Sequence, residues 1–83
     1  MERNQILSQL TEIFRRILGN PSLDLTEVTK ASDVDNWDSL THTLLLAEVQ
    51  RHFEIKLKLR EALDLKNIGD LCSLVSKKLN ENS

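Results

Sequence analysis

Trp37-Asp38-Ser39-Leu40 marks the point at which a long polar stretch gives way to the helical periodicity of the central segment. After this motif, apolar residues recur at three- and four-residue steps, which places them on one face of a helix. We therefore expect a helix that begins near Asp38–Ser39 and ends near Phe53. Its predicted core face consists of Leu45, Leu46, Val49 and Phe53, with His42 in the middle of that face and Leu40, Leu44 and Arg51 opposite.

Before the motif, residues 19–38 form a long connection rich in Asn, Asp and Ser. Loops of this length inside a compact domain are uncommon, and many of them are functional. Residues 4–18 have the spacing of an amphipathic helix, and Gly19 stands where a helix C-terminal glycine is expected. Four apolar residues of the connection are expected to anchor it to the core: Leu23, Leu25, Val28 and Val34.

After the central helix, Ile55–Leu59 alternates like a strand, but the chain offers no partner strand, so we expect an extended connection. A short helix through Arg60–Leu65 is predicted next. Asn67 can cap a last helix, with Asp70 reaching back as in a capping box. The inner face of that helix is expected to contain Ile68, Leu71, Cys72, Val75 and Leu79.

These segments predict an all-α fold, a four-helix bundle of three main helices and one short helix with a long loop between the first and second helices. The chain of 83 residues is expected to be a single domain, residues 1–83, with a disordered tail at about residues 80–83.

Composition and charge exclude several function classes. The chain has 11 Lys and Arg against 13 Asp and Glu, for a net charge of −2, so it lacks the basic excess of a generic nucleic-acid binder. It has no apolar run of the roughly 18 or more residues that a membrane span needs. One cysteine forms no internal disulfide, and no Cys/His cluster suggests a metal site. These features favour a cytoplasmic protein.

Ser39 is the residue with the clearest chemical role. At the start of a helix, unpaired backbone N–H groups and the helix dipole favour a phosphate. The sequence offers no local base that would activate Ser39, and it contains no Gly-x-Ser-x-Gly nucleophile elbow. A serine displayed without activation suits modification by another enzyme. On this motif alone, Ser39 could equally be only an N-cap.

The whole pattern resembles the acyl carrier protein family. The family's Asp-Ser-Leu, at the start of the second helix of a small four-helix bundle, matches Asp38-Ser39-Leu40, and the resemblance continues through Phe53-Glu54-Ile55 and Ile68-x-Asp70-Leu71. It implies that a phosphopantetheinyl transferase joins 4′-phosphopantetheine to Ser39, with Asp38 and Leu40 beside the attachment point. The thiol of the arm then carries an acyl intermediate as a thioester between acyl-loading and acyl-transfer or synthase enzymes. The implied protein is a carrier and not an enzyme.

The second helix departs from that of the fatty-acid carriers, which is markedly acidic. Residues 40–53 contain one acid, Glu48. We therefore predict a docking surface of Leu40, Leu44, Glu48 and Arg51 whose partners bind more through apolar contact than through salt-sensitive charge pairing.

Trp37 and His42 flank the predicted attachment point. Trp37 stands where fatty-acid carriers often have a small residue, and we predict that it packs the loop against the bundle as a lid. His42 is predicted to be hydrogen-bonded inside the bundle. The alternative for both residues is a direct role in lining the cargo site.

Trp-Asp-Ser-Leu-x-His is similar to the motif of discrete carriers in dedicated pathways, which include polyketide, surface-glycan and aminoacyl pathways. An aminoacyl carrier of the D-alanyl type is therefore an alternative function. An alternative from a different functional class is a plain helical interaction module in which Ser39 is only an N-cap.

Starting at Met1 and ending at Ser83, the chain resembles free-standing carriers. We expect a monomer without nucleic-acid or membrane partners.

Overall fold

The computed structural model describes residues 1–81. In this range it contains four α-helices and no strand, and a short 3-10 turn, η1 (Ala31–Asp33), lies within the first connection. The all-α prediction of three main helices, one short helix and a long first loop is confirmed. The helices are α1 (Arg3–Leu18), α2 (Ser39–Phe53), α3 (Leu59–Leu63) and α4 (Ile68–Glu81).

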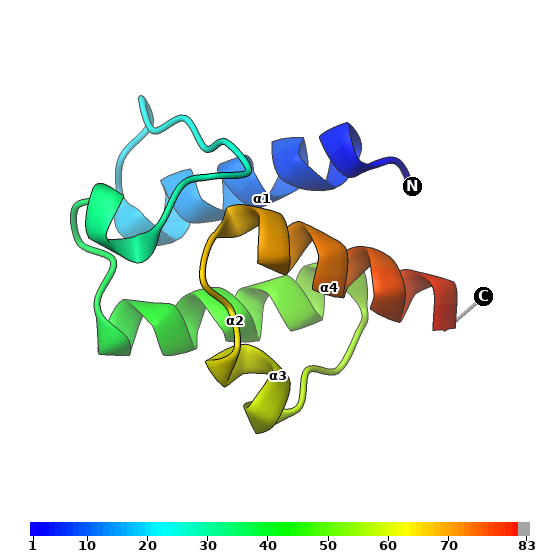
Figure 1. Cartoon of the computed structure of the whole chain (residues 1–83). Coiled ribbons are helices and arrows are strands. Elements are labelled where there is room, and N and C mark those ends of the chain that lie inside the picture. The colour runs from blue at the N-terminus through cyan, green and yellow to red at the C-terminus, as the bar shows by residue number, and fades with distance from the viewer. Residues whose placement is uncertain (82–83) are drawn as a thin grey trace.

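The first helix is the centre of the packing, because α1 contacts both α2 and α4. It runs antiparallel to them, and α3 lies across the opposite side of α2 and α4 (Figure 1). Both ends of the described chain lie at one end of the bundle, whereas α2 begins at the other end (Figure 1). The buried core contains Ile6, Leu10, Ile13, Phe14 and Leu18 of α1, Leu45, Val49 and Phe53 of α2, Ile68, Leu71, Cys72 and Val75 of α4, and Leu25, Val34 and Ile55 of the connections.

Left-handed residues end the first two helices. Gly19 follows α1 with φ +67°, a conformation that glycine adopts without steric cost, and its N–H donates to the carbonyl of Arg15. Glu54 ends α2 with φ +55°, and the N–H of Ile55 then donates to the carbonyl of Gln50 at 3.1 Å. The predicted ends of both helices are confirmed.

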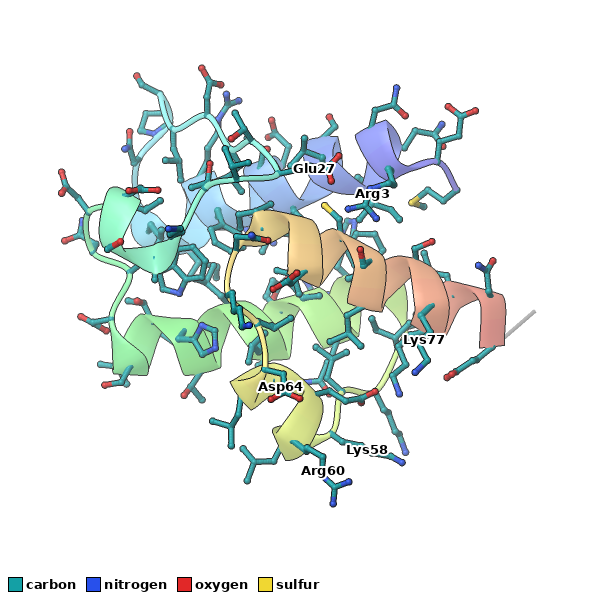
Figure 2. The ribbon with its side chains drawn as sticks, in the orientation of Figure 1. Arg3, Glu27, Lys58, Arg60, Asp64 and Lys77 are labelled. Carbon is teal, nitrogen blue, oxygen red and sulfur yellow. The ribbon has the colours of Figure 1, made fainter. Side chains whose placement is uncertain are left out.

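The long connection is fastened to the start of α4 by backbone hydrogen bonds. The N–H of Ile68 donates to the carbonyl of Thr29 at 2.9 Å, and the N–H of Gly69 donates to the carbonyl of Glu27 at 2.7 Å. The side chain of Arg3 reaches the same place, where it donates to the Glu27 carboxylate at 2.6 Å and to the Gly69 carbonyl at 3.0 Å (Figure 2). The first turn of α4 therefore satisfies its free N–H groups with the loop, as helix ends require.

One predicted anchor of this connection is wrong. Val28 is 75% exposed, whereas Leu25 and Val34 are buried and Leu23 is partly buried. The reason is a hydrogen-bonded turn over residues 26–29, in which the N–H of Thr29 donates to the carbonyl of Thr26 at 3.2 Å. Val28 lies at the tip of that turn, and it points to solvent.

The last helix extends into the stretch where a C-terminal tail was expected. The last helix continues through Asn80 and Glu81, and the remaining predicted tail residues lie outside the described range. Lys78 joins the end of α4 to α3 through an ion pair with Glu61 at 3.0 Å, and it lies 3.8 Å from Glu81. These contacts favour helix to its last described turn.

Two local predictions near α3 and α4 need adjustment. The short helix begins at Leu59 and ends at Leu63, because the side chain of Glu61 accepts from the Lys58 N–H at 2.9 Å and caps the first turn. Asn67 caps α4 as predicted, accepting from the Asp70 N–H at 2.9 Å. The Asp70 carboxylate, however, accepts from the N–H of Lys66 rather than from that of Asn67.

Candidate functional site

Ser39 is exposed and is the first residue of α2. The preceding residue, Asp38, is the N-cap of this helix, because one of its carboxylate oxygens accepts from the N–H of Leu40 at 3.0 Å and from the N–H of Thr41 at 2.9 Å. In return, the N–H of Asp38 donates to the Thr41 hydroxyl at 2.8 Å. The serine is thus held in place by backbone geometry while its own side chain faces solvent.

The Asp38 carboxylate is stabilised in its charged form. The N–H of Thr41 is the largest cause, and the Thr41 hydroxyl and the Leu40 N–H add to it, so the pKa of Asp38 lies below its ordinary value. The cap is therefore ionised at neutral pH, when a carboxylate at a helix N-terminus is most favourable.

Thr41 is a site residue that the sequence analysis missed. Its hydroxyl donates to the carbonyl of Asn36 at 2.6 Å and accepts from the Asp38 N–H, which ties the end of the long connection to the first turn of α2. Asn36 has a left-handed backbone, with φ +69°. The available signal was the spacing Asp38-x-x-Thr41, which is a capping box with Thr in the place of Glu.

Trp37 packs the end of the connection onto the bundle. Its indole meets the ring of Phe14 edge-to-face, with ring centroids 5.0 Å apart at 85°. It also stacks on the imidazole of His42 at 6.0 Å and 21°, and its Nε1–H donates to His42 Nδ1 at 3.0 Å. Both Trp37 and His42 are half-buried. The His42 ring therefore lies at the edge of the core and not in its middle, which corrects the predicted helical face.

A small cavity of about 60 Å³ lies behind these two rings. The connection between α3 and α4 contributes to its lining, and the sequence analysis did not include that segment. The cavity is lined by Phe14, Ala31, Trp37, His42, Leu45, Leu46, Leu65, Lys66, Asn67 and Leu71.

The outer face of α2 carries the residues predicted to dock partners. Leu40 is 70% exposed and Leu44 is 50% exposed, and Arg51 is exposed further along the helix. Glu48 is different, because only 16% of its side chain is exposed and its carboxylate pairs with Arg16 of α1 at 2.8 Å and with Arg51. Arg51 is the largest cause of the lowered pKa of Glu48.

Residues 1–81 contain no group of three or more His, Cys, Asp or Glu side chains placed to hold a metal ion. No helix in that range has both the length and the apolar composition needed to cross a membrane.

The chain as a whole matches a known family. A family profile described as "Phosphopantetheine attachment site" matches residues 8–75. The chain belongs to this family. It is a carrier protein, its prosthetic group is 4′-phosphopantetheine, and the resemblance to acyl carrier proteins is confirmed.

Two solved structures resemble this carrier. The holo acyl carrier protein of Geobacter metallireducens is 46% identical over 92% of this chain and 87% of that chain, with a TM-score of 0.86. An acyl carrier protein of Thermotoga maritima is 23% identical over 100% of this chain and 96% of that chain, with a TM-score of 0.87, and it supports the fold alone. A comparison with curated protein sequences found no significant match.

The side chains at the start of α2 fit such a prosthetic group. Ser39 is exposed, and its side chain takes no part in the hydrogen bonds of the Asp38 cap. An arm joined there displaces none of the hydrogen bonds that hold the turn.

Proposed function

We propose that Ser39 is the attachment point of the 4′-phosphopantetheine arm and that this carrier presents a thioester-bound acyl intermediate to biosynthetic enzymes. The observation that carries the proposal is the exposed serine at the first residue of α2, held by the reciprocal Asp38–Thr41 cap. The positive end of α2 favours the phosphodiester that attachment creates. Once attached, the arm supplies a terminal thiol that forms the thioester.

In the proposed attachment step, the Ser39 hydroxyl oxygen attacks the phosphorus of coenzyme A that bears the pantetheine group. A new bond forms between Ser39 Oγ and phosphorus, and the bond from that phosphorus to the adenosine 3′,5′-bisphosphate portion breaks. The hydroxyl proton passes to a base of the transferase, because no base within residues 1–81 of the carrier is hydrogen-bonded to the Ser39 hydroxyl. We infer that the carrier catalyses no step itself and depends on the transferase and on acyl-loading and acyl-transfer enzymes.

The test is to incubate the purified protein with coenzyme A and a broad-specificity phosphopantetheinyl transferase and then to measure its mass. We expect the mass of one phosphopantetheine to be gained by the wild type and not by Ser39→Ala. Ser32→Ala is the matched control, because Ser32 is an exposed serine in η1, and this variant should be modified like the wild type. A wild type that gains no mass, or a Ser39→Ala variant that does, contradicts the proposal. The first result would favour a plain helical interaction module.

We also propose that partner enzymes dock on the apolar face of α2. Leu40 and Leu44 are one turn apart and exposed, and Arg51 continues the same face with Glu48 holding its guanidinium. Apolar contact is little affected by salt, whereas exposed charge pairs are screened. Transient partners suit such a small surface because each must release the carrier after use.

The docking proposal is tested with the rate at which the transferase modifies the carrier. Leu44→Ala should lower kcat/KM several-fold, whereas raising the salt concentration should change the wild-type rate much less. Val28→Ala is the control, because Val28 is equally apolar and 75% exposed but lies on the loop. An unchanged rate for Leu44→Ala, together with a steep loss of rate in salt, would refute this surface.

Small aminoacyl groups are the second candidate cargo. The observation that favours them is the size of the cavity lined by Trp37 and His42, which is about 60 Å³.

We also propose that residues 1–83 act as one carrier domain that is monomeric and cytoplasmic.

A further inference from the structure

Two aromatic rings close in sequence to Ser39 line the small cavity. Trp37 and His42 lie two residues before and three residues after Ser39. The apolar side chains of Leu45 and Leu71 line the same cavity. We expect a cargo group on an arm at Ser39 that folds back into this cavity to contact the Trp37–His42 pair.

The two rings are held together by contacts that fix their orientation. The indole Nε1–H donates to His42 Nδ1 at 3.0 Å, so this ring nitrogen is the acceptor. Phe14 holds the other side of the indole in an edge-to-face contact. A half-buried indole N–H that loses its acceptor pays a desolvation penalty, so the pair resists separation.

The cavity is small compared with an acyl chain. A cavity that accepts benzene has a volume of about 150 Å³, and one water occupies about 30 Å³ of liquid. The 60 Å³ space therefore takes no group of six carbons unless the rings move.

We propose that the Trp37–His42 hydrogen bond is a specificity-determining latch that keeps this cavity closed to medium and long acyl chains. The carrier is thereby matched to short acyl or aminoacyl groups, which do not need this cavity. This inference rests on Ser39 being the attachment point, and it names the class of cargo.

The experiment compares two cargoes on the full-length protein. A phosphopantetheinyl transferase loads the arm directly from acetyl-coenzyme A or octanoyl-coenzyme A, and mass confirms each product. The wild type should melt at the same temperature with either cargo, and the emission of Trp37, the one tryptophan in the chain, should be the same for both. An octanoyl chain that enters the core buries several methylene groups and should stabilise the fold.

Substitutions of His42 separate the hydrogen bond from the bulk of the ring. His42→Ala removes both, and its octanoyl form should melt at least about 4 °C above its acetyl form. His42→Leu retains bulk without an acceptor and should show a smaller difference. His42→Gln keeps an oxygen acceptor for the indole and should behave like the wild type.

The outcomes separate a failure of the proposed latch from a failure of the proposed attachment at Ser39. A protein that accepts neither acyl-phosphopantetheine group overturns the proposed function and the latch with it. A loaded wild type that is stabilised by octanoyl as strongly as His42→Ala, or that changes its Trp37 emission, overturns the latch alone. The latch is equally overturned if His42→Ala folds and shows no difference between the two cargoes. If His42→Ala does not fold, the wild-type comparison still decides.

Discussion

Substituting Gly69 with alanine should destabilise the fold, although alanine is the better helix former. Gly69 is the second residue of α4, and its N–H donates to the carbonyl of Glu27 at 2.7 Å. A Cβ atom at this position would lie 2.8 Å from that backbone oxygen and 3.3 Å from the Glu27 Cβ. The connection must move away from α4, because the closest atom belongs to the backbone and not to a flexible side-chain tip.

The size of the effect follows from opposing terms. Helix propensity favours alanine by at most about 1 kcal/mol in a helix interior, and by less in the first turn. Overpacking costs about 1–3 kcal/mol. Losing the hydrogen bond from Gly69 to Glu27 costs a further ~1 kcal/mol. We therefore expect the free energy of unfolding to fall by about 1–3 kcal/mol, since the clash and the lost bond outweigh the propensity.

The assay is urea unfolding followed by far-UV circular dichroism, with the slope checked for two-state behaviour. Ser76→Ala is the matched control, because Ser76 is a partly exposed position of the same helix and should gain a few tenths of a kcal/mol from propensity alone. If Gly69→Ala were as stable as the wild type or more so, the close contact between the connection and α4 would be refuted.

Two further predictions test the loop and the cap. Leu25→Ala should lower the free energy of unfolding by about 2–4 kcal/mol because Leu25 is buried. Val28→Ala should change the free energy of unfolding by no more than about 0.5 kcal/mol. Equal losses for the two variants in urea unfolding would contradict the loop conformation. The lowered pKa of Asp38 means that its charged form is favoured in the folded state, so its contribution is present above about pH 4, the unfolded value, and is lost as the pH falls through the lower folded pKa. The stability difference between the wild type and Asp38→Asn should therefore shrink between pH 6 and pH 3, and a difference that grows on acidification would show that the charge is not what stabilises the cap.

The helices and the exposed serine could be predicted because they depend on local patterns. The apolar spacing defined α1, α2 and α4, Gly19 marked the first helix end, and Asp38 with Ser39 marked the start of α2. These signals are repeated along each segment, so one exception does not overturn them.

What could not be predicted depends on contacts between distant segments. Val28 was expected in the core because it is apolar, but the pairing of Glu27 with Arg3 and Gly69 determines which side of that turn faces the bundle. His42 was assigned to the core by its helical angle, yet its hydrogen bond to Trp37 sets its depth.

The site was partly predictable for the same reason. The spacing of Thr41 from Asp38 was visible in the sequence. The cavity lined by Trp37 also includes residues of the segment that joins α3 and α4, and no local sequence pattern places that segment there. Glu48 was predicted to belong to the docking surface from its position on the helix. Its ion pair with Arg16 could not be predicted, because it depends on how α1 packs against α2.

The termini of the described chain lie at the end of the bundle away from the start of α2 (Figure 1). An affinity handle, a fluorescent reporter or a linkage to a solid support fused ahead of Met1 would therefore leave the approach to Ser39 clear. Immobilised in this way, the protein could be charged repeatedly and its loading enzymes could be assayed on a surface.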